Sequence, residues 1–380
     1  MLLTDSPEEV FASIYKYPST FSVIAPGRIN LLGEHTDYNE GFVLPAAVDR
    51  AMTFCVAKRA DRQVNIYAID LNETLSQTLD TLNPDANSWA RYPVGMLLLM
   101  LKDGSQISTG FDMVFNSTIP LGAGMSSSAA LSSGVALCLK NLYGLSYSQK
   151  QMALLAQQTE HMYAKVKCGI MDMYASIFGR KDHVIKLDCR DLSHEYLPLS
   201  QEEISILLVN TEVKHNLAES AYNKRRESCE RVAEYFKVKS LRGLPMERLM
   251  EAEGQLSKED FKRAQYVLQE ELRMNRAIEV LTQNDLRGFG QLMYDTHEGL
   301  SNLYEVSCPE LDFLVEQTLD LPQVLGARMM GGGFGGCTIN LVKKEDVEDI
   351  ERILKEKYKL KFDLDPSTYV VSLTDGCRVL

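Results

Sequence analysis

A short stretch near the start of the sequence gathers charged side chains between two apolar runs. Residues 25–50 read APGRINLLGEHTDYNEGFVLPAAVDR, and they place four ionisable groups close together among glycines: Arg28, Glu34, His35 and Asp37, with Gly27, Gly33 and Gly41. A buried charge is costly unless it is paired or bound to something. The cluster is therefore either a solvated loop or a set of groups that converge on a polar ligand.

A second stretch is a glycine- and serine-rich loop, PLGAGMSSSAAL at residues 120–131. A loop of this kind before a helix aims backbone N–H groups and the positive end of the helix dipole at an anion, and its small residues let phosphate oxygens approach. The hydroxyls of Ser126, Ser127 and Ser128 add donors or metal-facing oxygens. A serine that caps the helix explains the same pattern, and neither GxxxxGK[ST] nor a strand-linked GxGxxG is present.

Two further stretches leave a functional and a plain interpretation open. In CGIMDMYASIFG, residues 168–179, Asp172 is the one charged residue among small and apolar neighbours. It either caps the following helix or is a buried carboxylate that accepts or orients a substrate hydroxyl proton, in which case it needs a partner such as Arg28 to remain ionised. In GGGFGG, residues 331–336, five glycines form either a tight turn before a strand or a close approach to a ligand.

The elements that must position these groups follow from the periodicity of apolar residues. We expect a strand-rich first half with two helices after the serine loop, then two more strands, and a mostly helical second half. The expected strands are 21–30, 51–59, 63–70, 110–117, 183–189, 204–211 and 368–373. The expected helices are 126–144, 148–166, 218–236, 258–281, 285–300 and 345–357. The change from strand-rich to helix-rich composition near 180–215 marks the expected domain boundary, because 380 residues exceed what one core usually serves.

Composition excludes several classes of function. The formal net charge is −12 and the basic residues form no sustained run, which disfavours nucleic acid or an anionic membrane as the partner. No signal peptide is recognisable in MLLTDSPEEVFASIYKY, and the apolar run at 94–101 is too short to span a bilayer. The eight cysteines and six histidines show no zinc-ligand spacing, so we expect reduced thiols in a cytoplasm and no protein-built transition-metal site.

In order and spacing, the four stretches together resemble the GHMP small-molecule kinases. GRINLLGEHTDYNEG, residues 27–41, resembles the galactokinase signature rather than that of mevalonate or homoserine kinases, and so do residues 213–230 and 304–315. The resemblance covers nearly the whole chain. It implies an α/β (α+β) fold of two domains, with the active site in the cleft between them. We expect the domains to be 1–180 and 181–380, with the last strand, near 368–374, packed on either one.

The resemblance also implies a role for each motif residue. The sugar hydroxyls are expected on Glu34, His35 and Asp37, with Tyr222 against the sugar ring and the Gly169 backbone nearby. Asp172 and Arg28 are the expected catalytic pair, which acts on the sugar 1-hydroxyl as it attacks the γ-phosphate of ATP. ATP is expected on the loop residues Gly122, Ala123, Gly124, Met125, Ser126, Ser127 and Ser128. Ser128 and Glu160 are expected to serve Mg²⁺, although Glu160 also fits a solvent-facing helix position.

The implied reaction makes galactose 1-phosphate and ADP, the first committed step of galactose use by the Leloir pathway, in a monomer or weak dimer. Met173 departs from the family, which usually has glutamine there, so hydrogen bonding beside Asp172 is in doubt. Two alternatives remain: a GHMP kinase for a related sugar, and a galactokinase-like sensor that binds sugar and ATP. The intact SSSAA run and the presence of Asp172, Arg28 and Glu160 disfavour the sensor.

Overall fold

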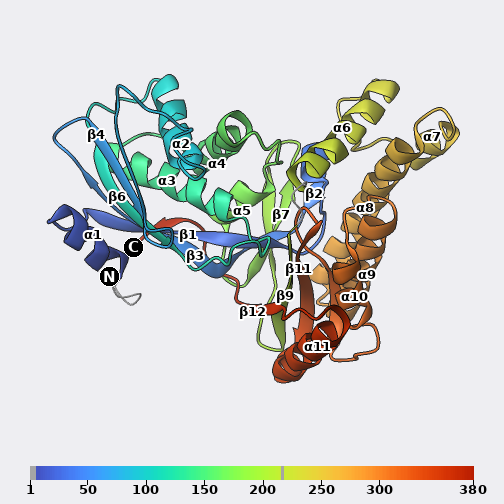
Figure 1. The fold of residues 1–380 in the computed structure, drawn as a ribbon. Coiled ribbons are helices and arrows are strands. Elements are labelled where there is room, and N and C mark those ends of the chain that lie inside the picture. The colour runs from blue at the N-terminus through green and yellow to red at the C-terminus, as the bar shows by residue number, and fades with distance from the viewer. Residues whose placement is uncertain (1–5, 215–217) are drawn as a thin grey trace.

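The computed structural model describes residues 6–214 and 218–380, and it arranges them around three sheets (Figure 1). Residues 1–5, from the stretch searched for a signal peptide, and 215–217, from the stretch 213–230, lie outside the described residues. The first sheet has the strand order β13-β1-β3-β6-β4-β5. In that order the strands are Arg378–Val379, Phe21–Asn30, Pro45–Lys58, Phe111–Ser117, Gln63–Ala68 and Glu73–Thr78.

The other two sheets belong mainly to the second half of the chain. One has the order β10-β11-β9-β12, with strands Val324–Met329, Gly335–Lys343, Ile204–Lys214 and Ser367–Val371. The small sheet β2-β7-β8 joins Phe42–Val43 from the first half to His183–Asp188 and His194–Pro198. Neighbouring strands pair antiparallel except β4 and β6, which run parallel. Mixed sheets and helices of this kind make an α+β architecture.

Helices cover each sheet and bury its apolar face. In the first half α3 packs on β1 and β3, and Figure 1 shows α2 to α5 above that sheet. Those helices are Arg91–Lys102, Ser127–Tyr143, Gln149–Thr159 and Met171–Phe178, and α1, Pro7–Tyr15, packs on β3 and β6. The later helices α6 to α11 are Ala218–Phe236, Met246–Glu251, Lys258–Thr282, Leu286–Asn302, Pro309–Glu316 and Val347–Phe362. Short helical turns occur at Asp37–Asn39, Glu160–Ala164 and Lys344–Asp346.

Local sequence explains where the helices around the site begin and end. Gly144 terminates α3 in the left-handed conformation, with φ of 64°, which glycine adopts without steric cost. Ser148 begins α4 with a capping box, in which its side chain and that of Gln151 each accept a backbone N–H of the other residue. The expected helix over 148–166 ends earlier, at Thr159, and continues as a π-helical turn over Glu160–Ala164.

Most long expected elements are confirmed. The strand at 21–30 has the expected bounds, and the helices near 126–144, 258–281 and 285–300 shift by at most two residues at either end. The strand expected near 368–374 is β12, which pairs with β9 of the second half, and the chain then returns to the first sheet as β13. The division at 180/181 stays a prediction. No helix within the described ranges is long and apolar enough to cross a membrane.

Candidate active site

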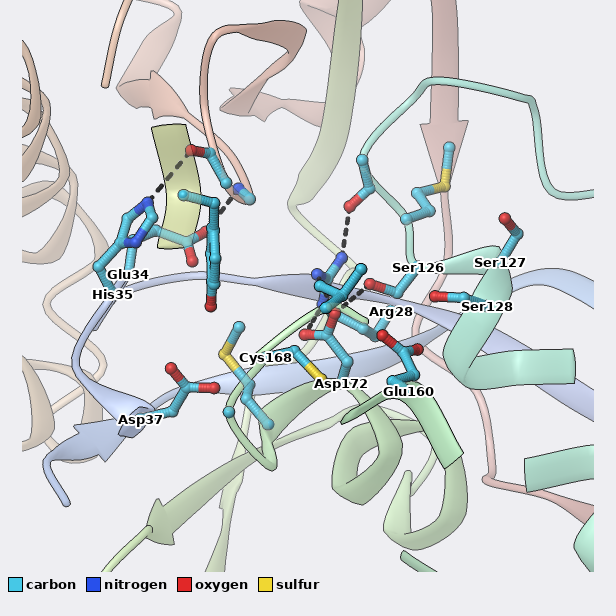
Figure 2. Close-up of a pocket in the computed structure, with 18 of the residues that line it drawn as sticks. Arg28, Glu34, His35, Asp37, Ser126, Ser127, Ser128, Glu160, Cys168 and Asp172 are labelled. Atoms are coloured by element: carbon cyan, nitrogen blue, oxygen red, sulfur yellow. Dashed lines mark hydrogen bonds and ion pairs between the residues drawn. The ribbon is translucent and has the colours of Figure 1, made fainter. Parts of the chain in front are cut away.

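One cavity of about 380 Å³ collects nearly all of the site residues predicted from sequence (Figure 2). Its lining includes Arg28, Glu34, His35, Asp37, Gly122, Gly124, Met125, Ser126, Ser127, Ser128, Glu160, Gly169, Asp172 and Tyr222. Ala123 is the exception, because its side chain is fully buried in the main hydrophobic core. A role for Ala123 in binding ATP stays a prediction. Segments far apart in the sequence therefore converge, and the cluster at 28–37 is buried rather than solvated.

An arginine–aspartate pair occupies the middle of this cavity. Arg28 Nε donates to Asp172 Oδ1 at 2.8 Å and Arg28 Nη2 donates to Asp172 Oδ2 at 2.7 Å, a two-pronged contact. Ser126 Oγ also donates to Asp172 Oδ2. Burial alone would lower the pKa of Arg28, but the charges of Asp172 and Glu34 raise it overall. Asp172 is thus a paired, hydrogen-bonded carboxylate that faces the cavity, in the first turn of α5.

The sequence PGR positions this arginine through an irregular strand. The pairing of β1 with β3 shifts register between Pro26 and Arg28, and such bulges re-aim side chains next to sites. Arg28 N donates to Met125 O at 3.1 Å, and Arg28 Nη1 donates to Gly124 O. A Cβ on Gly27 would lie 2.8 Å from Met125 O, so only glycine lets the serine loop approach the strand this closely. Arg28 therefore joins the sheet, the loop and α5.

Asp37 and Gly169 form one wall at the end of the cavity that faces away from α3. A Cβ on Gly169 would lie 1.8 Å from Asp37 Oδ2, so the carboxylate occupies the space that any side chain there would need. Burial first, and then the charge of Asp172, raise the pKa of Asp37 to about 7. Its Oδ1 accepts from the backbone N–H of Tyr38 at 2.9 Å. This carboxyl is held in place but lacks a cationic partner in direct contact among the described residues.

His35 lines the same cavity, and both of its ring nitrogens have hydrogen-bond partners. Nε2 lies 3.2 Å from Gly332 O, which can only accept, so Nε2 carries the proton. Nδ1 then accepts from Tyr38 Oη at 2.8 Å, and Tyr38 Oη lies 2.7 Å from Tyr304 Oη. Burial lowers the pKa of His35 to about 4, which agrees with a neutral ring. The imidazole is therefore fixed in one tautomer.

The glycine run and Tyr222 close the same end of the cavity. Gly331 and Gly332 line it, and a Cβ on Gly332 would lie 3.4 Å from the ring of Tyr222. The Tyr222 ring lies 5.2 Å, centroid to centroid, from that of His35. Of the two interpretations of GGGFGG, its first glycines belong to a cavity wall, while Gly335 begins strand β11. The turn before a strand is therefore confirmed, and the close approach to a ligand stays a prediction.

The serine loop and the start of α3 form the opposite end of the cavity. The N-cap residue Ser126 has φ of 52°, a left-handed conformation unusual for serine, and its side chain makes no cap hydrogen bond. Its hydroxyl goes to Asp172 instead, so a serine begins the helix as the plain interpretation expects, but its side chain does not cap it. The first N–H groups of α3 have no intrahelical acceptor by helix geometry, and they suit an anion. Ser127 and Ser128 lie there too.

Glu160 also lies at this end, and it is buried rather than solvent-facing. It opens the π-helical turn after α4, a distortion that is frequent at functional sites. Burial raises the pKa of Glu160 to about 7, although the Ser128 hydroxyl opposes that shift. Its Oε1 is buried with no hydrogen-bond partner within the described part of the chain. A carboxylate oxygen of this kind suits a hard cation, whereas no group of three or more His, Cys, Asp or Glu side chains among the described residues forms a metal centre.

Sequence reasoning missed three residues that support the cavity lining from behind, and it gave Met173 too large a part in the site. Tyr38 and Tyr304, which orient His35, carry no motif beyond their places in the quoted stretches. Arg328, which contacts Glu34, stands three residues before the glycine run, and this proximity was the only available signal. Met173 is fully buried in the main core and does not line the cavity, so the departure from glutamine lies behind the site.

Known protein families and solved structures match this chain. Three family models match: the galactokinase galactose-binding signature over residues 9–58, the GHMP kinases N-terminal domain over 91–180, and the GHMP kinases C-terminal domain over 277–360. The fold and the site therefore define a GHMP kinase. The crystal structure of Methanococcus jannaschii mevalonate kinase shares this fold at 18% identity, with a TM-score of 0.69 over 93% of this chain and 98% of that one.

Closer relatives narrow the class. The chain is 38% identical over 379 residues to the galactokinase of Glaesserella parasuis serovar 5 (strain SH0165), with 97% of each chain covered. It is 39% identical over 357 residues to the galactokinase of Thermotoga maritima, covering 94% of this chain and 99% of the relative. The crystal structure of Lactococcus lactis galactokinase complexed with galactose superimposes with a TM-score of 0.94 at 32% identity, covering 98% of both chains. The chain belongs to the galactokinase family.

Proposed function

We propose that this chain transfers the γ-phosphoryl group of ATP to the 1-hydroxyl of D-galactose, and releases galactose 1-phosphate and ADP. One observation carries the proposal: the Arg28–Asp172 pair lies between two chemically different ends of one cavity. One end carries two carboxylates and an imidazole on the galactose-binding signature, with the ring of Tyr222 beside the imidazole, and the other carries serines at a helix N-terminus. A sugar and a nucleotide phosphate that bind these ends meet at Asp172.

Asp172 and Arg28 act on the reacting oxygen. In the reaction a bond forms between the sugar O1 and the γ-phosphorus, and the bond from that phosphorus to the bridging oxygen of ADP breaks. Asp172 accepts a hydrogen bond from the 1-hydroxyl, orients it, and receives its proton as the new bond forms. Arg28 keeps Asp172 charged and offsets the negative charge that develops nearby. Positioning and electrostatics of this kind supply most of the catalysis in phosphoryl transfer.

The sugar end supplies acceptors in fixed directions. Carboxylates accept hydrogen bonds from neighbouring hydroxyls, so Glu34 and Asp37 suit adjacent sugar hydroxyls, and the fixed imidazole of His35 lies beside them. Tyr222 presents an aromatic face to the ring. Because Asp37 lies against Gly169, the backbone at Gly169 borders the same hydroxyls.

ATP and Mg²⁺ fit the other end. The loop 122–128 and the N-terminus of α3 offer N–H groups and hydroxyls to phosphate oxygens. Ser128 and Glu160, whose Oε1 has no partner among the described residues, offer hard oxygen donors, which Mg²⁺ prefers. Bound Mg²⁺ would neutralise charge on the phosphates. Because the described residues offer few ligands there, phosphate oxygens and water would supply the others. We further propose that the protein acts in the cytoplasm as a monomer or weak dimer, in agreement with its eight free cysteines.

The test is an ADP-release assay over a panel of sugars with Mg²⁺ and ATP, followed by phosphorus NMR of the product. We expect fastest turnover with galactose and a product phosphorylated at the anomeric oxygen. Faster turnover of an N-acetylhexosamine or a pentose would make the chain a kinase for a related sugar. Tight binding of galactose and ATP without turnover would instead indicate a sensor.

A further inference from the structure

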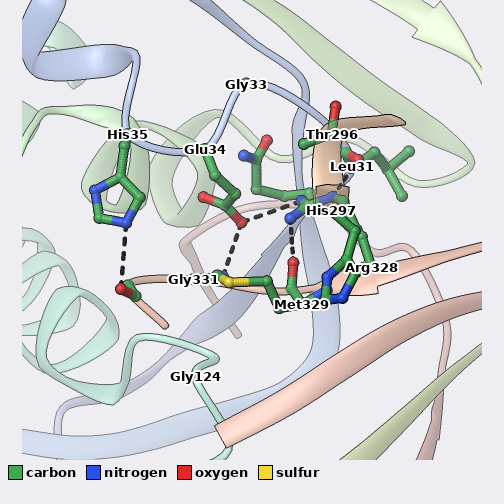
Figure 3. Close-up of polar contacts among 12 residues, drawn as sticks. Leu31, Gly33, Glu34, His35, Gly124, Thr296, His297, Arg328, Met329 and Gly331 are labelled. Carbon is green, nitrogen blue, oxygen red and sulfur yellow. Dashed lines mark hydrogen bonds and ion pairs between the residues drawn. The ribbon is translucent and has the colours of Figure 1, made fainter. Parts of the chain in front are cut away.

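Arg328, on strand β10, is a fully buried arginine beside the sugar end of the cavity (Figure 3). Its guanidinium donates to three backbone carbonyls: Leu31 O at 2.8 Å from Nε, Met329 O from Nη1, and Asn30 O from Nη2. Nη2 also lies 3.1 Å from Glu34 Oε1. The carbonyls are neutral, so the carboxylate of Glu34 is the negative charge that Arg328 contacts.

Glu34 is held by this arginine at one oxygen. The side chain is 2% exposed, and its Oε1 accepts both from Arg328 Nη2 and from the backbone N–H of Gly331 at 2.8 Å. Those contacts leave Oε2 as the oxygen for a ligand in the cavity that Glu34 lines. An ionised carboxylate with so little exposure needs a hydrogen-bonded cationic partner, and Arg328 is that partner.

We propose that Arg328 is a positioning residue for the sugar. It pairs with Glu34 through Oε1 and aims its Oε2 at a sugar hydroxyl. It does so from the sheet of the second half, while its contacts with Asn30 and Leu31 fix the end of strand β1 from which the sugar signature departs. Arg328 therefore acts through Glu34 and touches no reacting atom. This inference rests on the proposed function.

The chain supplies a matched control in a second ion pair, on helix α8, which contacts the same loop. Arg273 pairs with Glu270, which is fully buried and accepts from the backbone N–H of Gly33 at 3.0 Å. Neither residue of this pair lines the cavity. Both arginines support the loop at Gly33 and Glu34: Arg273 does so through Glu270, which accepts from Gly33, and Arg328 contacts Glu34 directly. Of the two, only Arg328 contacts a carboxylate that lines the cavity.

The experiment compares Arg328→Met, Arg328→Lys and Arg273→Met with the unaltered protein, by kcat, by KM for galactose and for ATP, and by thermal unfolding. We expect Arg328→Met to raise the KM for galactose about 10–100-fold, since a misplaced binding group costs that much, with kcat and the KM for ATP within about threefold. Arg328→Lys keeps the charge but loses the planar fork, and we expect a smaller rise of the same kind. Arg328→Lys also tests the inference if Arg328→Met does not fold. Arg273→Met should lower the unfolding temperature and leave the KM for galactose within about threefold.

A double variant separates positioning from general support. If Arg328 acts through Glu34, adding Arg328→Met to Glu34→Gln should raise the KM for galactose by less than about threefold beyond Glu34→Gln alone, because the effects are coupled. Multiplied effects, or equal rises in both KM values with the loss of kcat, would make Arg328 a structural residue only. An unchanged KM for galactose in Arg328→Lys and Arg328→Met would also overturn the inference. No galactose turnover by the unaltered protein would instead overturn the proposed function.

Discussion

The two ends of the cavity differ in how completely their polar groups are paired. At the sugar end, both nitrogens of His35 and one oxygen of Glu34 have partners within the protein. At the phosphate end, Glu160 is buried with an unpartnered oxygen within the described residues, and the N-terminus of α3 offers N–H groups that the helix itself cannot satisfy. The protein itself thus pairs most polar groups at the sugar end, whereas the phosphate end leaves polar groups that a ligand could pair.

The Arg28–Asp172 pair stands between the two ends, and its removal should have the largest effect. We expect Asp172→Asn to lower kcat about 1,000-fold, because the amide cannot take the proton of the sugar hydroxyl or balance Arg28. Single-turnover kinetics would measure the loss, and calorimetry should find galactose affinity within about tenfold of the unaltered protein. A variant that keeps more than a tenth of the normal kcat would remove Asp172 from the reaction.

A substitution at Glu160 tests whether the two ends of the cavity act separately. We expect Glu160→Gln to raise the KM for Mg·ATP about 10–100-fold, since an amide lacks the charge that a hard cation prefers, and to leave the KM for galactose within about twofold. Initial rates over a range of Mg²⁺ concentrations would measure both constants, and excess Mg²⁺ should recover part of the loss. Equal rises in the two constants would show that Glu160 supports the whole cavity rather than its phosphate end.

The smallest expected effect is the pH dependence of the sugar end. Asp37 has a pKa raised to about 7 by burial, so below that pH it is mostly protonated and accepts hydroxyls poorly. The KM for galactose should therefore fall about tenfold as pH rises from about 6 to about 8, and Asp37→Asn should flatten that slope. Glu160 titrates in the same range, so the KM for ATP serves as the internal reference. A slope unchanged in Asp37→Asn would assign it to another group.

The raised pKa of Asp37 also makes the free energy of unfolding depend on pH. Without sugar, the folded protein keeps a proton on Asp37 up to pH of about 7, whereas the unfolded chain loses that proton near pH 4. The folded state therefore binds more protons over this interval, and the contribution of Asp37 to the free energy of unfolding falls as pH rises through it. Urea unfolding at several pH values, compared with Asp37→Asn, would isolate this contribution.

Most of the lining of the site was predictable because its residues sit in continuous motifs. Arg28, Glu34, His35 and Asp37 lie in one strand and the turn after it, so short-range spacing alone put them together. The long amphipathic helix α8 and the strand β1 were predictable for the same reason, since their periodicity is sustained. The family resemblance then implied that segments far apart in the sequence meet at one site, which residue spacing alone does not reveal.

The remaining features depend on contacts between distant segments. Nothing local predicts that Arg328 reaches the carbonyls at the end of β1, or that Ser126 turns from its helix to Asp172. The π-helical turn at Glu160 is invisible to a 3.6-residue period, which extended the expected helix to 166. Short strands such as β2 and β13 form because a neighbouring strand pairs with them, and their own sequences do not predict a strand.

The last strand carries a consequence for biosynthesis. Val379 pairs with Val23, and Leu373 bridges to Val48, so the final residues described here form an edge of the sheet that bears Arg28. During synthesis β1 leaves the ribosome before the second half of the chain, and β13, which pairs with β1, follows that half. The edge of β1 that pairs with β13 therefore stays unpaired until the second half has been synthesised.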